Sequence, residues 1–351
     1  PASHHRAGQR ARARLEEIRE KVAVLLGAEL GSRGDRLVFT SGGTEANNLA
    51  LRGLALRGPR RLIVSAMEHP SILETAEALA QSGVRVEKLG ADSTGVVRLE
   101  ELRRRLSEPA SLVAIMLANN ETGVVQPAAE IAALCSEARV PWHCDAVQAV
   151  GKMPLSFAGL GAATLSFNAH KLHGPRGVGG LLVRRGTPLA PLLFGGFQQD
   201  GLRPGTEDIG LPAGLLSALE LAHEEAEERT ARMAALRDRL EAGVLAADLR
   251  ALVVGAESPR LPHTSCIAFR GLDRQALLLA LDMAGLACST GSACASGSSE
   301  PSPVLVAMGC EEEVIGGALR FSLGAGTTAE EIEEAVGIIV RAAAKLRRAA
   351  P

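Results

Sequence analysis

The sequence contains no tyrosine and a single tryptophan, and aromatic residues make up only 2% of its 351 positions. Hydrophobic residues nevertheless account for 46% of the chain. Because aromatic rings can supply little of the buried surface, the core must be built from aliphatic side chains. The chain is long enough for a large core, and ordinary domain sizes predict two domains.

The sequence also lacks an excess of either charge, with 38 Lys+Arg against 40 Asp+Glu. This balance argues against dedicated nucleic-acid binding and against attachment to a membrane surface. Arginines do gather near the start of the chain, but acidic residues follow them at helical spacing, which is typical of a solvated amphipathic helix. No apolar run is long enough to span a bilayer and no signal peptide is recognisable, so no membrane association is expected.

No Cys-x-x-Cys pair occurs among the six cysteines, which argues against a structural zinc site. Six cysteines in a chain of this size also do not make a disulfide framework. We therefore expect a reducing cytoplasm in which most thiols are buried and inert. The cysteines are Cys135, Cys144, Cys266, Cys288, Cys294 and Cys310.

Short apolar segments alternate with helical segments over the first half of the chain. This alternation predicts an α/β domain with a mostly parallel sheet and right-handed crossovers. A helix over residues 8–26 precedes the first of these segments. The expected strands are residues 36–40, 62–65, 85–89, 111–117, 140–144, 162–165 and 177–183.

Polar residues follow five of the predicted strands. Because parallel strands of a doubly wound sheet end at one edge, these side chains are expected to converge there and form a single active site. They are Thr44, His69, Asn120, Asp145 and Lys171.

Lys171 and Asp145 form the most informative pair within this set. Lys171 stands between His170 and His173, and Asp145 ends another apolar strand. A lone lysine at a strand end is usually a solvated side chain. A lysine able to form a Schiff base, paired with an aspartate able to keep a pyridine nitrogen protonated, meets the two needs of a pyridoxal phosphate site.

The glycine-containing turn at residues 41–48 has two interpretations. Glycines between a strand and a helix N-terminus let backbone N–H groups converge on an anion. The same pattern also occurs in an ordinary tight strand–helix turn, and no Gly-Lys-Ser/Thr of a P-loop follows it.

The last third of the chain has a different pattern. Long helical segments over residues 211–246 lead to a second domain that begins near Leu252. This domain has strands at 265–269 and 318–322, and its last helix starts at a capping box of Thr328 and Glu331. We assign residues 15–211 to the large domain, and residues 212–351 together with 1–14 to a smaller α+β C-terminal domain.

Seven motifs occur in the order found in the cysteine desulfurase family, the NifS/IscS-like group of class-V aminotransferases, which the whole chain resembles. The resemblance implies the type I fold of pyridoxal phosphate enzymes, with a seven-stranded-type sheet in the large domain. The motifs lie at residues 41–48, 68–70, 119–123, 145–148, 170–171, 203–206 and 291–294.

The resemblance implies a role for individual residues. Lys171 binds the cofactor covalently, Asp145 pairs with its ring nitrogen and His69 stacks on the ring, and Lys171 and His69 are also catalytic residues. Gln148 and Asn120 contact the phenolic oxygen. Asn120 also binds the substrate, and Arg320 clamps the substrate carboxylate with its planar fork. The phosphate is held by Thr44, Gly43, His170 and Asn168, and by Thr206 from a neighbouring subunit.

Two departures from the family pattern affect these expectations. Asn168 stands where the family usually has a serine that donates to the phosphate, and an amide can also donate. The family carries an additional N-terminal strand with an Asn-Ala-Ala-Thr-Thr-like turn before the first helix. The printed sequence starts beyond that point, so either the numbering starts late or this part of the site wall is missing.

Cys294 is the predicted nucleophile. In a polypeptide rich in aliphatic residues, a cysteine is usually a small buried hydrophobic residue. We expect this of Cys135, Cys144, Cys266 and Cys310. Cys294 instead lies in a Gly/Ser/Ala-rich loop that can hardly pack a core, so an exposed thiol there suggests chemical use. Cys288 lies nearby but resembles the end of a strand.

The resemblance thus implies a homodimeric enzyme with shared active sites that converts L-cysteine to L-alanine and leaves sulfur on Cys294 as a persulfide. The sulfur then passes to an iron–sulfur cluster scaffold or to another thiol acceptor. A selenocysteine lyase or a class-V aminotransferase is the alternative within enzymes. A metal- or cluster-binding carrier using His4, His5, His69, His143 and the cysteines is the alternative outside them, although their spacing fits no common ligand pattern.

Overall fold

The computed structural model describes residues 3–31, 34–291 and 300–349. Its contacts divide the chain into two compact units. Unit 1 comprises residues 1–89, 99–117 and 127–226, and unit 2 comprises residues 90–98, 118–126 and 227–351.

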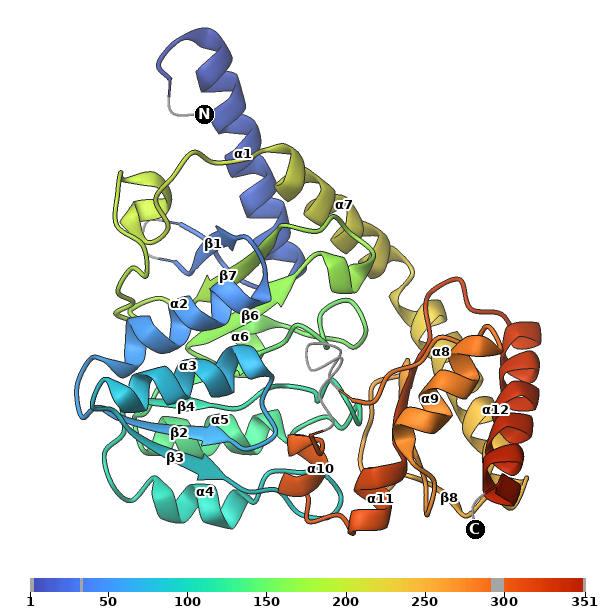
Figure 1. Cartoon of the computed structure of the whole chain (residues 1–351). Helices are drawn as coiled ribbons and strands as arrows, with labels where there is room; N and C mark the ends of the chain where they lie inside the picture. The colour runs from blue at the N-terminus through green and yellow to red at the C-terminus, as the bar shows by residue number, and fades with distance from the viewer. Residues whose placement is uncertain (1–2, 32–33, 292–299, 350–351) are drawn as a thin grey trace. The chain divides into compact units, whose positions relative to one another are not determined.

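Unit 1 is built on a seven-stranded sheet in the order β1-β7-β6-β5-β4-β2-β3 (Figure 1). Of these strands, β7 runs antiparallel to both of its neighbours and the other pairs are parallel. The prediction of a mostly parallel sheet is therefore confirmed. The bounds are β1 Arg36–Thr40, β2 Arg61–Ser65, β3 Arg85–Leu89, β4 Leu112–Ala114, β5 Trp142–Asp145, β6 Thr164–Asn168 and β7 Gly179–Val183.

The helices of unit 1 connect these strands. Helices α2 and α3 pack side by side against the strands (Figure 1), α4 packs on α5, α5 on α6, and α1 on α7. The central strands are buried along their whole length, as expected for parallel strands covered on both faces. The bounds are α1 Arg6–Leu25, α2 Gly43–Ala55, α3 Pro70–Gln81, α4 Leu99–Arg105, α5 Ala128–Glu137, α6 Phe157–Leu160 and α7 Gly210–Glu224.

Two 3-10 turns complete this unit, His170–Leu172 after β6 and Gln198–Gly201 before α7. Strand β6 extends to Asn168, whereas the sequence pattern ended that strand at residue 165. Ser166, Phe167 and Asn168 continue the ladder because they pair with Leu181, Gly180 and Gly179 of β7. Lys171 therefore lies in the turn that directly follows the end of β6.

Glycine at position 179 is required by close packing. A Cβ at Gly179 would lie 2.6 Å from the carbonyl oxygen of Phe167 and 2.8 Å from the Cα of Gly42. Strand β7 can therefore approach the turn that begins α2 only without a side chain here.

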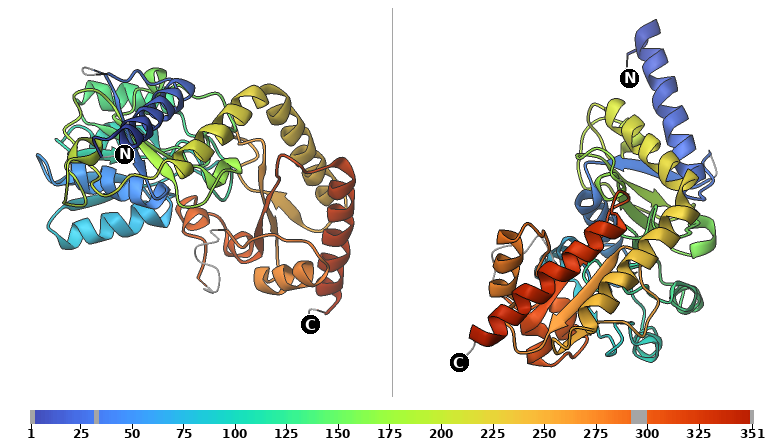
Figure 2. Two further views of the ribbon diagram at one scale, coloured as in Figure 1. Left: turned by 90° about the horizontal axis from the view of Figure 1, so that it is seen from above. Right: turned by 90° about the vertical axis from the view of Figure 1, so that its right-hand side faces the viewer.

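Unit 2 contains a three-stranded antiparallel sheet in the order β10-β9-β8. Helices α8, α9 and α12 bury their apolar faces with this sheet, and α8 and α12 lie side by side (Figure 2). Thr328 and Glu331 form the predicted capping box in front of α12. The bounds are α8 Ala226–Leu245, β8 Ala251–Val253, β9 Thr264–Phe269, α9 Arg274–Met283, α10 Pro303–Ala307, α11 Glu312–Gly317, β10 Ala318–Ser322 and α12 Ala329–Ala349.

The division of the chain differs from the expected one. Residues 1–14 belong to unit 1, because α1 is continuous through this region and packs on α7. Unit 1 also extends to residue 226 rather than 211, since α7 continues it. Two short segments, 90–98 and 118–126, join unit 2 through contacts that no local pattern reveals. None of the described helices combines the length and apolar character needed to cross a membrane.

Candidate active site

Asp145 lies at the end of β5 with 7% of its surface exposed. Asn47 on α2 donates from Nδ2 to Asp145 Oδ2 at 2.7 Å, and the backbone N–H of Val147 donates to Oδ1 at 2.9 Å. Burial raises the pKa of Asp145, whereas these hydrogen bonds and the nearby His69 oppose the shift. The carboxylate is therefore held in one orientation at a site where an additional cationic partner would stabilise it.

Asn47 connects four elements of unit 1. Its Nδ2 also donates to Ser71 Oγ on α3 at 2.8 Å, and its Oδ1 accepts from Ser166 Oγ on β6 at 2.5 Å. The Nε2 atom of His143 on β5 lies 3.0 Å from the same Oδ1. Because Oδ1 is an acceptor, His143 carries its proton on Nε2. Burial lowers the pKa of His143 to about 3, so the ring is neutral.

His69 caps the start of α3. Its Nδ1 accepts from the backbone N–H of Ser71 at 3.1 Å and lies 2.9 Å from Ser71 Oγ. Since Nδ1 is an acceptor, the neutral ring carries its proton on Nε2. Burial lowers the pKa of His69, Asp145 opposes this shift and Lys171 adds to it. Unit 1 thus brings three predicted site residues, His69, Asp145 and Lys171, within electrostatic range of one another.

Lys171 is half-buried in the 3-10 turn after β6. Its backbone N–H donates to Asn168 Oδ1 at 3.2 Å, so the Asn168 side chain caps this turn. That contact commits Oδ1 as an acceptor and leaves Nδ2 as the donor side of the amide. A Cβ at Gly43 would lie 3.3 Å from this Nδ2 atom.

Positive charge gathers around His170. Burial lowers the pKa of His170, and the charges of Lys171, Arg176 and Lys152 lower it further. Thr44 lies in the first turn of α2, whose N-cap, Gly42, provides no side-chain cap. Cations and a helix N-terminus without a side-chain cap each suit a phosphate.

Glu68, the residue before His69, is a second buried carboxyl group in this region. One of its oxygens, Oε1, accepts from the backbone N–H of Met116 at 2.8 Å. Burial raises the pKa of Glu68 well above its usual value, and the charge of Asp145 raises it further. Burial and the charge of Asp145 thus both favour the uncharged form of Glu68.

Thr206 is exposed and lines a cavity of about 190 Å³ in unit 1, together with Thr40, Ser41 and Arg203. Arg203 Nε donates to Glu45 Oε1 at 2.9 Å, which ties the segment that carries Thr206 to α2. Gln148 is half-buried in the turn directly after Asp145.

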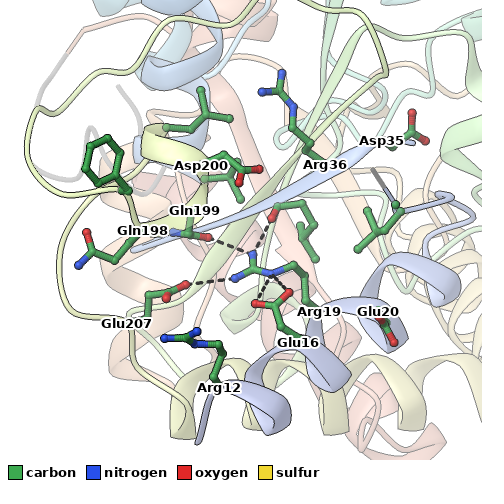
Figure 3. A pocket seen from close by; sticks show the side chains of 16 residues that line it. Arg12, Glu16, Arg19, Glu20, Asp35, Arg36, Gln198, Gln199, Asp200 and Glu207 are labelled. Carbon is green, nitrogen blue, oxygen red and sulfur yellow. Dashed lines mark hydrogen bonds and ion pairs between the residues drawn. The ribbon is translucent and has the colours of Figure 1, made fainter. Parts of the chain in front are cut away.

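A second, larger pocket of about 710 Å³ contains Arg19 of α1 (Figure 3). Its guanidinium donates to the Leu37 carbonyl at 2.6 Å, to Gln199 Oε1 at 3.1 Å and to Glu207 Oε1 at 3.1 Å. Gln199 in turn accepts from the backbone N–H of Phe39 and donates to its carbonyl. These bonds hold the 197–207 segment against strand β1.

In unit 2, the structure brings together two of the predicted substrate contacts. Arg320 on β10 donates from Nη1 to the backbone carbonyl of Asn120 at 2.9 Å. Because Asn120 belongs to unit 2, its convergence with the polar residues of unit 1 stays a prediction.

Cys294, the predicted nucleophile, lies outside the described residues. Burial raises the pKa of each cysteine that the structure describes, to about 12 for Cys135 and about 11 for Cys288. The same direction holds for Cys144, Cys266 and Cys310. These thiols are therefore poor nucleophiles near pH 7. Among the described residues, no three His, Cys, Asp or Glu side chains gather in a way that could hold a metal ion.

Four residues of this arrangement were not identified as site residues from the sequence: Asn47, Arg19, Gln199 and Glu45. Asn47 belongs to a motif that the sequence analysis did single out, but nothing local shows that its amide reaches two strands and another helix. Arg19 could be interpreted only as part of a solvated helix, whereas it is buried.

The chain belongs to the class-V aminotransferase family, whose family model matches residues 2–335. The fold and the site agree with this match: a mostly parallel seven-stranded sheet presents a buried aspartate and a lysine at its strand ends.

Within that family, the chain is similar to cysteine desulfurases. It is 42% identical to the cysteine desulfurase NifS of Azotobacter vinelandii, over 100% of this chain and 87% of that protein. It is 40% identical to an IscS-like cysteine desulfurase of Mycobacterium tuberculosis, over 99% of this chain and 90% of that protein. A solved NifS-like protein superposes with a TM-score of 0.89 at 35% identity, covering 99% of this chain and 92% of the other.

The Asn47 network predicts a large effect on stability. Asn47→Leu removes the donors to Asp145 and Ser71, takes one acceptor from Ser166 and leaves Nε2 of His143 without its acceptor. Unmet buried polar groups cost about 1–3 kcal/mol each, so the free energy of unfolding should fall by about 3 kcal/mol in urea titrations. Asn48→Ala is the matched control, because that neighbouring amide only returns to the Thr44 carbonyl of its own helix. Equal stability of the two variants would contradict the assigned network.

Proposed function

We propose that this chain is a pyridoxal phosphate-dependent cysteine desulfurase that converts L-cysteine to L-alanine and transfers the sulfur to Cys294 as a persulfide. The observation that carries the proposal is the grouping of a buried Asp145, a neutral His69 and a half-buried Lys171 at the strand ends of unit 1. The names of the relatives supply the substrate.

The residues of unit 1 fit pyridoxal phosphate. Asp145 is a buried carboxyl group whose hydrogen-bond donors are uncharged. A protonated ring nitrogen would give it a cationic partner. The cations around His170, the N-terminus of α2 and the amide of Asn168 suit the phosphate. When bound, pyridoxal phosphate supplies an electron sink that weakens bonds near the substrate α-carbon.

The side chains of the chain itself have separate tasks in this proposal. Lys171 would hold the cofactor covalently, and Asp145 would pair with its ring nitrogen. His69 lies over the ring with its proton on Nε2, and Gln148 and Asn120 contact the phenolic oxygen.

The phosphate contacts are Gly43, Thr44, Asn168 and His170, together with Thr206 of a second copy. Arg320 binds the substrate carboxylate, and its guanidinium is already oriented by the Asn120 carbonyl.

The sulfur-transfer step balances without an added oxidant or reductant. The Cys294 sulfur attacks the substrate sulfur, the Cβ–Sγ bond breaks, and the carbon left behind takes a proton to become the methyl group of alanine. The thiol of Cys294 becomes a persulfide, which retains one hydrogen.

We also propose a homodimer with shared active sites. Phe194 and Phe197 are 89% and 96% exposed, in a chain with seven phenylalanines, and they precede Thr206 by a few residues. Large exposed rings of this kind mark a protein contact. A second copy would cover them and receive Thr206 in its phosphate site.

The sulfur acceptor is an iron–sulfur cluster scaffold or another thiol protein, and the location is the cytoplasm, which the free thiols at five described cysteines support. A selenocysteine lyase would use the same site with a different substrate preference. An aminotransferase has no need of a thiol in the 291–294 motif. No observation favours a metal or cluster carrier.

Lys171→Ala should abolish alanine formation while leaving the fold unchanged. In the wild type, borohydride treatment should fix the cofactor on the peptide that contains Lys171, as detected by mass spectrometry. Lys88→Ala, a surface lysine on β3, is the control and should retain both properties. Desulfuration by the Lys171→Ala enzyme would refute the assignment.

Cys294→Ser separates cofactor binding from sulfur transfer. This variant should still bind the cofactor and change its absorption spectrum on adding L-cysteine, but it should form no alanine, because a hydroxyl cannot accept the sulfur. Brief exposure of the wild type to L-cysteine should add one sulfur atom to the peptide holding Cys294. Cys288→Ser should behave like the wild type, and extra sulfur on Cys288 would show that the nucleophile is misassigned.

Replacing Phe197 tests the dimer. Phe197→Ser should shift the protein toward a monomer in light scattering, since a large apolar side chain contributes about 1.5–3 kcal/mol when buried. Leu279→Ser on α9, also an exposed apolar residue, should leave the mass unchanged. A wild-type protein that is monomeric at micromolar concentration would rule out the shared site.

A further inference from the structure

The segment Asn119–Gly123 forms a rigid turn in unit 2. The side-chain oxygen of Asn119, Oδ1, accepts from the backbone N–H of Glu121 at 2.9 Å and from that of Thr122 at 3.0 Å. The N–H of Gly123 closes the turn on the Asn119 carbonyl at 3.0 Å. The turn fixes the direction of two groups, the carbonyl of Asn120 and the side chain of Glu121.

Glu121 is a buried carboxylate that the proposed reaction does not use. Glu121 is 2% exposed, and its Oε2 atom accepts a hydrogen bond from Ser302 Oγ at 2.6 Å. The Ser302 hydroxyl is the donor here, because an ionised carboxylate can only accept, and the hydroxyl oxygen also accepts from the backbone N–H of Leu305 as the N-cap of α10. Burial raises the pKa of Glu121, whereas Ser302, Arg320 and Arg274 oppose that shift.

Glu121 also meets both described ends of the segment that contains Cys294. At one end, a Cβ at Gly291 would lie 2.6 Å from Glu121 Oε2, and Gly291 has a φ of +105°. At the other end lies Ser302, and the nearby Glu300 carbonyl accepts from Arg274. Residue 302 is therefore hydrogen-bonded to the carboxylate against which residue 291 packs closely.

The same carboxylate faces the proposed substrate clamp. Arg320 pairs through its backbone with Ser289, with Ser289 N donating to the Arg320 carbonyl at 3.1 Å, and its guanidinium donates to the Asn120 carbonyl. Glu121 and Arg320 line one small cavity with Arg274, and the other lining residues are uncharged. Two arginines face one carboxyl group in this cavity, so the guanidinium of Arg320 is not matched by a second carboxyl group there and suits a further anion, such as a substrate carboxylate.

We propose that Glu121 is a positioning residue that acts through two contacts: its charge orients Arg320 for the substrate carboxylate, and its hydrogen bond to Ser302 fixes the described ends of the cysteine-bearing segment. This proposal rests on the proposed function for the role of Arg320, but the anchoring of residues 291 and 302 does not depend on the reaction. It assigns a part to each residue of the 119–122 motif: Asn119 builds the turn, Asn120 and Glu121 hold Arg320, and Thr122 supports the turn by donating to Asn119.

Two variants of the full-length holoenzyme separate the two contacts. Glu121→Gln keeps an acceptor for Ser302 but removes the charge, so KM for L-cysteine should rise about tenfold with a smaller change in kcat. Ser302→Ala keeps the charge but removes the hydrogen bond, so KM should change little. Arg320→Lys should raise KM as Glu121→Gln does, and the double variant should be no worse than the single Arg320→Lys change, because both act on one interaction.

The anchoring of residues 291 and 302 can be measured by protease cleavage, without following the reaction. Elastase cleaves after small residues, and Ala293 and Ala295 lie between the two anchored ends in the sequence. Ser302→Ala and Gly291→Ala should both accelerate cleavage at these sites by about threefold or more, followed by mass spectrometry, because loosened ends open more often. Gly291→Ala acts by pressing a methyl group against Glu121 at a backbone angle that favours glycine.

Glu241→Gln is the matched control, since Glu241 is similarly buried and paired with Arg260 in the same unit. It should lower thermal stability without changing KM or the cleavage rate. A Glu121→Gln enzyme that only loses stability, as this control does, would overturn the proposal. If the wild type releases no alanine, the proposed function fails, while the elastase comparison still decides whether Ser302 and Gly291 are anchored on Glu121.

Discussion

The buried charge of Asp145 is the constraint on which the rest of unit 1 depends. A carboxylate removed from water is costly unless donors and cations replace the lost hydration. Asn47 and Val147 donate hydrogen bonds to Asp145, and the charge of Asp145 in turn helps raise the pKa of the nearby Glu68. The orientation of Asn47 then depends on Ser166 and His143, so one charge determines the arrangement of polar groups on α2, α3, β5 and β6.

Asn168 is another side chain of unit 1 whose polar atoms have separate uses. Asn168 uses its oxygen to cap the turn of Lys171, which leaves its N–H₂ group as a donor. The two polar atoms of one amide can therefore serve two different partners.

Local sequence patterns identified the strands and the residues that follow them, because apolar runs bounded by glycine, proline and polar residues are a local signal. They placed His69, Asp145 and Lys171 correctly at strand or helix ends. They could not identify Asn47 or Gln199, whose importance comes from hydrogen bonds to residues distant in sequence. For the same reason they missed that residues 90–98 and 118–126 belong to unit 2, since that assignment arises from contacts such as those between Gln126 and Gly95 and between Val125 and Pro259. The position of Arg19 shows a further limit, because an arginine in a charged helix is interpreted as solvated unless its distant partners are known.

Strand β1 pairs with β7, which comes much later in the sequence, whereas β2, β3, β4 and β5 pair with strands close to them in the chain. The other edge of β1 is covered by the side-chain amide of Gln199, which bonds to both backbone groups of Phe39 as a strand residue would. During synthesis on the ribosome, β1 therefore emerges early and waits, with its backbone unpaired, until most of unit 1 has been translated. An apolar strand in that condition is a template for association between nascent chains. Gln199, which follows β7 in the chain, then covers this edge at Phe39.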